Sequence, residues 1–323
     1  MDSTTTELVY EIKGALRVYK NGTVERFLDT DFVPPSFNLP PSLSSKDVTI
    51  ISDPNITARL YLPKIDYPNQ KFPLLLYFHG GAFCLSSPFN NKYHNYIAKL
   101  VAEANIVAVS VNYRKAPEHP IPAAFEDSWA ALQWIASHRN NNGPEPWLND
   151  HADFGRLFLA GEISGGNIAH NLAISAGASD SGLGIEILGV ALVHPFFWGS
   201  ESVGSEWMDP DRKAAVDGLW PMICPSNPDN DDPRVNPVVE GGAGLVGLGC
   251  KRVFVAVSEK DILKDRGWIY YNVLSRCGWM GVAEICETEG EEHGFHLNDL
   301  ESEKAKDLIE SLCFFFNRDM PSF

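Results

Sequence analysis

The strongest constraint on the fold is an alternation between short, continuously apolar segments and longer segments with helical periodicity. Strands that are apolar on both faces, separated by helices, are typical of an α/β protein whose mostly parallel, twisted sheet is covered by helices on both faces. The predicted strands are residues 47–51, 58–62, 74–78, 106–111, 157–160, 187–193, 253–257 and 283–287, and the predicted helices are residues 93–104, 123–138, 163–176, 265–277 and 303–316.

Two regions interrupt this alternation. Residues 1–40 contain two short predicted strands, 15–19 and 23–26, around an Asn21-Gly22 turn that favours a hairpin, and then a proline-rich stretch at 33–41 that cannot be helical. Residues 199–249 are rich in proline, tryptophan and polar residues. We expect a single domain spanning residues 1–323, in which both regions form a lid over the same pocket. The short links between the first strands of the sheet predict an antiparallel edge.

Composition excludes several classes of function. The formal net charge of −16 and the pI of about 4.9 argue against nucleic-acid binding. The longest apolar run, at 187–193, is far shorter than the roughly 20 residues of a membrane helix. The N-terminus lacks the apolar core of a signal peptide, and the six cysteines lack metal-binding spacing. We therefore expect a cytoplasmic protein with reduced thiols, no metal and no cofactor, acting on a small molecule as a monomer or weak homodimer.

The sequence GEISGGN at 161–167 joins a predicted strand to a predicted helix. This is where hydrolases place a nucleophilic serine, in the pattern Gly-x-Ser-x-Gly. Gly161 and Gly165 are present, but the residue between them is Ile163, which has no nucleophilic atom.

Other polar residues follow the predicted strands at the same edge of the sheet, where α/β proteins bind their ligands. Gly80 and Gly81 follow the strand at 74–78, Asp261 follows 253–257, and His293 follows 283–287. The order of nucleophile position, aspartate and histidine is that of an α/β-hydrolase triad. We predict that His293 is a base oriented by Asp261, and that the bare backbone N–H groups of Gly80 and Gly81, with that of Ser164, stabilise an oxyanion.

Three alternatives stay open at this point. The acid and base have near neighbours of the same type, namely Glu259, Glu291, Glu292 and His296. Ser164 is an alternative nucleophile, but one step along a helix turns a side chain by about 100°, away from His293. An accidental or engineered loss of serine at position 163 is also compatible with the sequence.

The sequence resembles the plant carboxylesterase family, which is related to hormone-sensitive lipases and has the α/β-hydrolase fold. The stretches that carry the resemblance are YFHGGAFC (77–84), VNYRKAPEHPIPAAFEDSWAALQWIASH (111–138), WLNDHADFGRLFLAGEISGGNIAHN (147–171) and ETEGEEHGFHL (287–297). It implies that Gly80, Gly81 and Ser164 form the oxyanion hole, that Asp261 and His293 are the acid and base, and that Ile163 stands where the family has serine.

Within this family the chain is most similar to the 2-hydroxyisoflavanone dehydratases, in which threonine can replace the serine and water is lost from the substrate. Other members are alkaloid cyclases, and the gibberellin receptors bind a ligand without catalysis but lack the histidine that is kept here at 293. The resemblance therefore implies a lyase or cyclase of plant specialised metabolism, with a weak carboxylesterase and a non-catalytic binding protein as alternatives.

The typical contributions of catalytic groups to reaction rate favour the lyase among these three functions. A general base contributes about 10²–10⁴ in rate, and one oxyanion donor contributes about 10²–10³. Together these are enough for a reaction that needs only proton abstraction beside a carbonyl, whereas ester hydrolysis also needs the nucleophile. Aromatic residues near the predicted site suggest a flat, apolar substrate bound by Phe83, Phe89, Phe197, Trp198 and Trp220.

Overall fold

The central sheet has eight strands in the order β11-β10-β9-β8-β6-β7-β5-β4, in a computed structural model that describes residues 7–36 and 43–318. The pairs from β7 through β6 to β11 are parallel, while β5 is antiparallel to both β7 and β4. The prediction of a mostly parallel sheet with an antiparallel edge is therefore confirmed. The strands are β4 (Ser44–Ile51), β5 (Ile56–Leu62), β6 (Phe72–Phe78), β7 (Val107–Asn112), β8 (Ala152–Glu162), β9 (Ile187–Val193), β10 (Cys250–Ser258) and β11 (Val282–Thr288).

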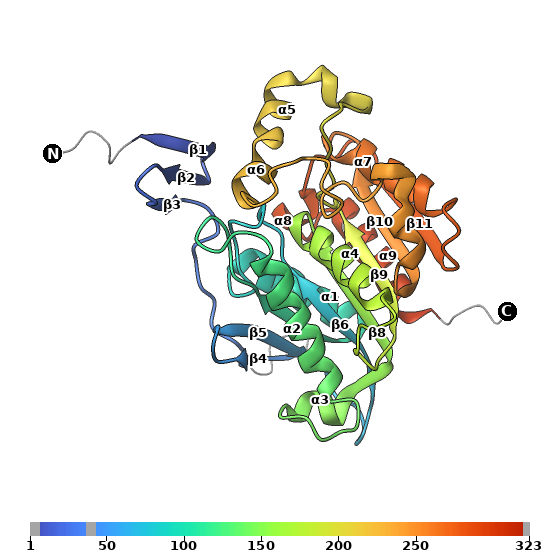
Figure 1. The fold of residues 1–323 in the computed structure, drawn as a ribbon. Helices are drawn as coiled ribbons and strands as arrows, with labels where there is room; N and C mark the ends of the chain where they lie inside the picture. The colour runs from blue at the N-terminus through green and yellow to red at the C-terminus, as the bar shows by residue number, and fades with distance from the viewer. Residues whose placement is uncertain (1–6, 37–42, 319–323) are drawn as a thin grey trace.

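Strand β6 shows why the sheet is covered on both faces. Side chains alternate between the two faces of a strand. Leu74 and Leu76 belong to one hydrophobic cluster, with α2, α4 and α7, while Leu75 and Tyr77 belong to the other, with α1 and α9. Figure 1 shows these helices on opposite sides of the sheet. The helices that cover it are α1 (Asn91–Ala104), α2 (Ala123–Ser137), α4 (Ser164–Gly177), α7 (Lys264–Leu274) and α9 (Glu303–Asn317).

Several elements were not predicted because they are too short for a periodic pattern. Strand β1 (Leu8–Ile12) extends the hairpin of β2 (Leu16–Tyr19) and β3 (Val24–Arg26) to a separate three-stranded sheet. Helix α3 (Pro146–His151) occupies only six residues between α2 and β8, with the Glu145 side chain capping it. Helix α8 (Phe295–Asn298) follows the loop of His293.

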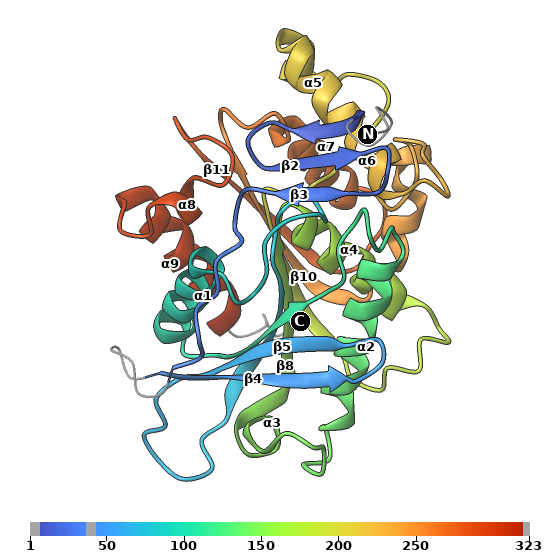
Figure 2. The same ribbon diagram turned by 90° about the vertical axis from the view of Figure 1, so that its left-hand side faces the viewer.

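Residues 199–249 form a helical insertion between β9 and β10, with no strand in the described residues of that region. It consists of α5 (Pro210–Asp217), α6 (Leu219–Ile223) and two 3₁₀ segments, Gly204–Met208 and Val239–Gly247. Figures 1 and 2 both show the small sheet of β1–β3 beside α5 and α6.

Polar contacts join the small N-terminal sheet to the rest of the molecule. The Tyr10 hydroxyl donates to the Ala215 carbonyl in α5, and the Arg26 guanidinium donates to the Cys84 carbonyl and to Glu118. Cys84 lies just after β6, so the sheet contacts both the insertion and the loop that follows Gly80 and Gly81. Residues 1–6 and 37–41 of the predicted appendage and proline-rich stretch lie outside the described residues.

Within the described part of the chain, no helix has the length and hydrophobicity needed to cross a membrane. All six cysteines are free thiols.

Candidate active site

Ile163 stands at the apex of a sharp turn between β8 and α4. Its backbone has φ 55° and ψ −114°, a left-handed conformation that is an outlier for a β-branched residue. Such strain costs about 1–3 kcal/mol and persists only where the surrounding structure enforces it. Here the Ile163 N–H donates to Val193 O, and its carbonyl accepts from the N–H groups of Phe196 and Asn167. The turn thus has the sharp, strained backbone that is typical of a nucleophile elbow, and the side chain at its apex is isoleucine.

Both glycines of the motif are required by packing. A Cβ at Gly161 would lie 2.3 Å from the backbone of Gly165, and a Cβ at Gly165 would lie 1.9 Å from the Phe78 carbonyl. The side chain of Ile163 extends towards the loop after β6, because a Cβ at Gly80 would lie 3.2 Å from its Cδ1 atom.

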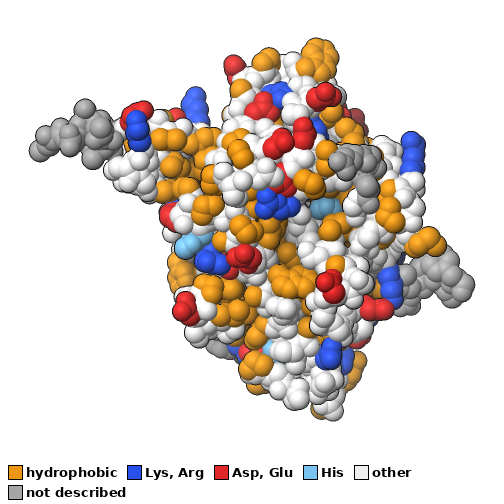
Figure 3. All heavy atoms as spheres, viewed as in Figure 1, with side chains coloured by type: hydrophobic (Ala, Val, Ile, Leu, Met, Phe, Trp, Pro, Cys, Tyr) orange, Lys and Arg blue, Asp and Glu red, His pale blue; other side chains and the backbone are white. Residues whose placement is uncertain are grey.

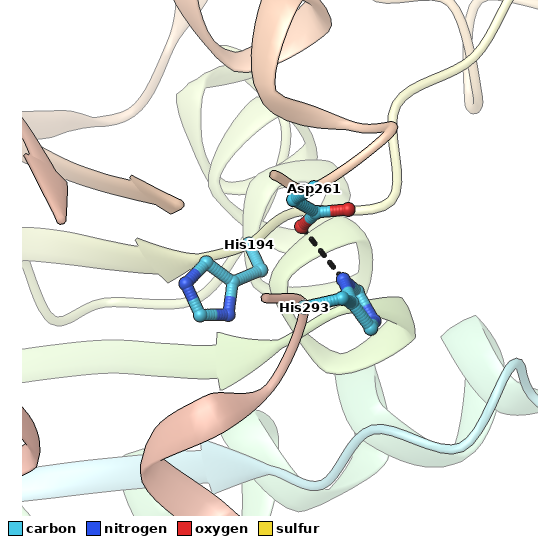
Figure 4. Close-up of side chains that lie close together, drawn as sticks. All are labelled: His194, Asp261 and His293. Carbon is cyan, nitrogen blue, oxygen red and sulfur yellow. Dashed lines mark hydrogen bonds and ion pairs between the residues drawn. The ribbon is translucent and has the colours of Figure 1, made fainter. Parts of the chain in front are cut away.

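His293 and Asp261 are paired, as the spacing predicted. The Nδ1 atom of His293 donates to Asp261 Oδ2 at 2.6 Å (Figure 4). Asp261 is buried, and Leu263 N–H donates to its other oxygen. Burial opposes ionisation of Asp261, but the charge of His293 and the hydrogen bond from it outweigh burial and lower the pKa of the carboxyl. The His293 side chain is 28% exposed, so the ring is accessible on its other side.

The neighbouring candidates for acid and base have other partners. Glu259 accepts a hydrogen bond from Gly290 N–H. His296 is fully buried, and its Nε2 atom lies 3.3 Å from an oxygen of Glu162, which also accepts from the Tyr77 hydroxyl. Glu162 directly precedes Ile163, so this buried network holds the end of β8 next to the turn.

One part of the predicted oxyanion hole is wrong. The Gly80 N–H is not bare, because it donates to the Tyr93 hydroxyl at 2.8 Å. Gly81 has φ +107° and Ala82 has φ 54°, and in the described part of the chain no acceptor is hydrogen-bonded to either N–H. Gly81 and Ala82 are therefore the residues of this loop whose N–H groups have no acceptor in the described part of the chain, and nothing in the sequence indicates the left-handed backbone of Ala82.

Ser164 contributes its backbone rather than its side chain. It is the first residue of α4, so its N–H has no acceptor within the helix and lies at the positive end of the helix dipole. Its hydroxyl is buried beside the Tyr113 phenol, and among the described residues no hydrogen bond joins it to His293. This position supports the prediction that Ser164 does not act as the nucleophile.

His194, at the end of β9, is a second histidine that the sequence analysis missed (Figure 4). Its Nδ1 atom accepts from Gly294 N–H at 3.3 Å, and its Nε2 atom lies 2.7 Å from Ser258 Oγ. Burial, followed by the charges of the neighbouring histidines, holds its pKa well below the ordinary value, so the ring is neutral. A neutral ring that accepts at Nδ1 donates from Nε2 to Ser258. The ring therefore links Ser258, at the end of β10, to Gly294, the residue that follows His293.

His194, Asp261 and His293 offer ligand atoms within 4.8 Å of one another. A metal needs a free lone pair on each nitrogen ligand. Both nitrogens of His194 are already hydrogen-bonded, so this cluster does not fit a metal ion.

Four of the five aromatic residues predicted to bind substrate lie in the hydrophobic core. Their exposed fractions are 2% or less, so in this conformation they present no surface to a ligand: Phe83, Phe197, Trp198 and Trp220. The prediction of substrate contacts is corrected for these residues, because each packs against another ring or a guanidinium in the core. Phe89 is partly exposed and packs against Phe32 and Arg59.

Comparisons with known proteins agree with this geometry. Residues 75–297 match a family described as alpha/beta hydrolase fold. The chain is 44% identical over 318 residues to probable carboxylesterase 2 of Arabidopsis thaliana, which covers 98% of this chain and 99% of that protein. It is 46% identical over 321 residues to the 2-hydroxyisoflavanone dehydratase of Glycyrrhiza echinata, covering 97% and 98% of the two chains. The hyperthermophilic esterase of the archaeon Pyrobaculum calidifontis has the same fold, with a TM-score of 0.71 and 26% identity over 84% of each chain.

Proposed function

Because this chain belongs to the plant carboxylesterase family of the α/β hydrolase fold, we propose that it is a lyase that eliminates water from a β-hydroxy carbonyl compound without a serine nucleophile. The observation that carries this proposal is the combination of Ile163 at the apex of the turn with an intact hydrogen bond between His293 and Asp261. The base and the oxyanion donors remain, and the attacking atom does not.

The first step of the proposed reaction is proton abstraction. Asp261 holds the Nδ1–H of His293, which leaves the Nε2 lone pair free to act as a base. His293 takes the proton from the carbon next to the substrate carbonyl, and the electrons of that C–H bond form an enolate. The N–H groups of Gly81, Ala82 and Ser164 stabilise the enolate oxygen by hydrogen bonding.

The second step is loss of the β-hydroxyl group. The enolate electrons form the carbon–carbon double bond as the C–O bond breaks. The imidazolium of His293 returns its proton to the departing hydroxyl, which leaves as water. The net change is loss of one water, and no oxidant or cofactor is consumed.

Ile163 supports elimination over hydrolysis for a chemical reason. Removal of the serine of a triad costs on the order of 10⁶ in turnover in a protease, so efficient ester hydrolysis needs that hydroxyl. An aliphatic side chain at the apex prevents formation of an acyl-enzyme and leaves His293 available to the substrate itself.

A weak carboxylesterase is the second candidate. It is favoured by the similarity to a probable carboxylesterase and by a turn that retains the backbone geometry of a nucleophile. In that case, His293 activates water directly instead of a serine.

The test uses a 2-hydroxyisoflavanone, the compound class in the name of one relative. Its hydroxyl is β to the carbonyl, as the proposed reaction requires. We expect loss of water, measured by mass spectrometry, with His293→Ala about 10²–10⁴-fold slower and Ser164→Ala active. Unchanged compound together with hydrolysis of nitrophenyl acetate indicates the esterase, and saturable binding without either reaction indicates a binding protein.

A further inference from the structure

A cavity of about 540 Å³ lies between α2, α4 and residues 233–245 of the insertion. Figure 3 shows this face of the molecule with a hollow near its centre, bordered by hydrophobic side chains. Phe125 and Trp129 line it from α2, and Ile174 lines it from α4. None of the residues that line the cavity belongs to the candidate active site.

Hydrogen bonds fasten the insertion to α4 at both ends of this cavity. At one end, the side-chain amides of Asn167 and Asn171 donate to the Arg234 carbonyl at 2.7 and 2.9 Å. At the other end, Gly249 N–H donates to the Ala173 carbonyl at 2.9 Å. Residues 233–249 therefore form a strap that is fastened to α4 at both ends and leaves a space between. A Cβ at Gly244, which lines this space, would meet nothing within 4 Å.

Packed aromatic rings lie between the cavity and the loop after β6. Phe125 lines the cavity and packs edge-on against Phe83, with ring centroids 5.9 Å apart. Phe83 follows Ala82 in the loop after β6 and also packs edge-on against Trp220. The cavity therefore adjoins the loop after β6 through these rings, and its lining includes neither Ala82 nor His293.

Among the described residues that line the cavity, none carries an uncompensated charge. Arg234, the charged residue among those that line it, donates to both oxygens of Asp232, at 2.9 and 2.5 Å. His170 is buried against Tyr270, and burial lowers its pKa to about 3, so its ring is neutral. A charged ligand would lose its hydration here without gaining a free counter-ion.

We propose that this cavity is a second ligand site, which binds a neutral, planar aromatic molecule of about three rings carrying one hydroxyl or carbonyl group. Phe125 and Trp129 are partly exposed and provide ring faces for stacking. His170 and Asn171 provide polar atoms for the single oxygen. The site is independent of the proposed lyase reaction, because it shares no residue with it.

The probe for this site is 9-phenanthrol, with phenanthrene-9-carboxylate as its charged analogue, in titration calorimetry with the full chain. We expect the carboxylate to bind at least about 10-fold more weakly, because burial of an unpaired charge is costly. Ser175 lies at the exposed rim, and its hydroxyl donates to the carbonyl one helical turn earlier. Ser175→Phe is expected to weaken binding of 9-phenanthrol by about 10-fold or more, because it fills the entrance.

Ser275→Phe is the matched control. Ser275 is equally an exposed serine that donates to a carbonyl one turn earlier, but it follows α7 and does not line the cavity. We expect binding to be unchanged in Ser275→Phe and in His293→Ala, and a soaked crystal to show the probe between α2 and α4. Binding that survives Ser175→Phe, or that is lost in His293→Ala, or a probe found beside His293, overturns the proposal.

Discussion

The Nδ1 atom of His293 lies 2.6 Å from Asp261 Oδ2, while the apex of the neighbouring turn offers isoleucine instead of a hydroxyl. A hydrogen bond of this kind orients an imidazole so that its second nitrogen acts as a base. We propose that the pair is arranged for proton transfer, and a nucleophile introduced at residue 163 tests this proposal.

We expect Ile163→Ser to hydrolyse nitrophenyl acetate at least about 10³-fold faster than the wild type, since loss of a triad serine costs on the order of 10⁶. The turn already has the required backbone conformation, with φ 55° and ψ −114°. The control is Ser164→Ala, which should leave the rate of both proteins nearly unchanged. Equal rates for wild type and Ile163→Ser would show that the turn does not aim residue 163 at His293.

The stability of the protein should depend on pH through Asp261. The pKa of this carboxyl is lowered in the folded protein. Its contribution to the free energy of unfolding is therefore fully present above the ordinary aspartate pKa of about 3.9 and is lost as the pH falls through the lower, folded-state pKa. We expect Asp261→Asn to destabilise the protein by about 1–3 kcal/mol near neutral pH and by much less near pH 3. Urea unfolding at the two pH values measures this, and an equal loss at both would contradict it.

The sequence predicted the fold well because the fold depends on long periodic segments. Every strand predicted in the main sheet is present, and β9 has the predicted bounds, because a buried parallel strand must be apolar throughout. Helix α3 and strand β1 were not predicted, because neither has a periodic apolar face. A side-chain cap stabilises α3, and pairing with β2 stabilises β1.

The sequence predicted the parts of the candidate site that depend on the place of one residue after a strand. Asp261 and His293 could be found because each follows a strand, and parallel strands bring their ends together. The hydrogen bond from the Gly80 N–H could not be predicted, since its acceptor is the hydroxyl of Tyr93 in helix α1, 13 residues further along the chain. The burial of Trp198 and Trp220 depends on how the insertion folds back, which no local pattern encodes.

His194 should act as a positioning residue for His293. Its ring accepts from the N–H of Gly294, so its loss should let the loop of His293 shift. In the Ile163→Ser background, we expect His194→Ala to lower kcat for ester hydrolysis by about 10-fold, because small misplacements of a base are costly. The proton NMR signal of the His293 Nδ1–H should also broaden or move upfield. Ser258→Ala, which removes only the acceptor of the His194 Nε2–H, should have a smaller effect on both measurements. A lower kcat with an unchanged proton signal would mean that His194 only supports the fold.

The proposed mechanism makes its sharpest prediction for two substitutions with the same substrate. If His293 takes the α-proton, His293→Ala should lower the rate of water loss by about 10²–10⁴ and change substrate binding little. Ile163→Ala should have a far smaller effect on rate, since that side chain shapes the site and takes no part in bond breaking. Solvent deuterium provides a second measurement, because the enolate can be reprotonated before the hydroxyl leaves. Wild-type protein should therefore place deuterium on the α-carbon of recovered substrate, and His293→Ala should not. Water loss that continues in His293→Ala at the wild-type rate would remove His293 as the base, and binding without water loss or exchange would identify the chain as a binding protein.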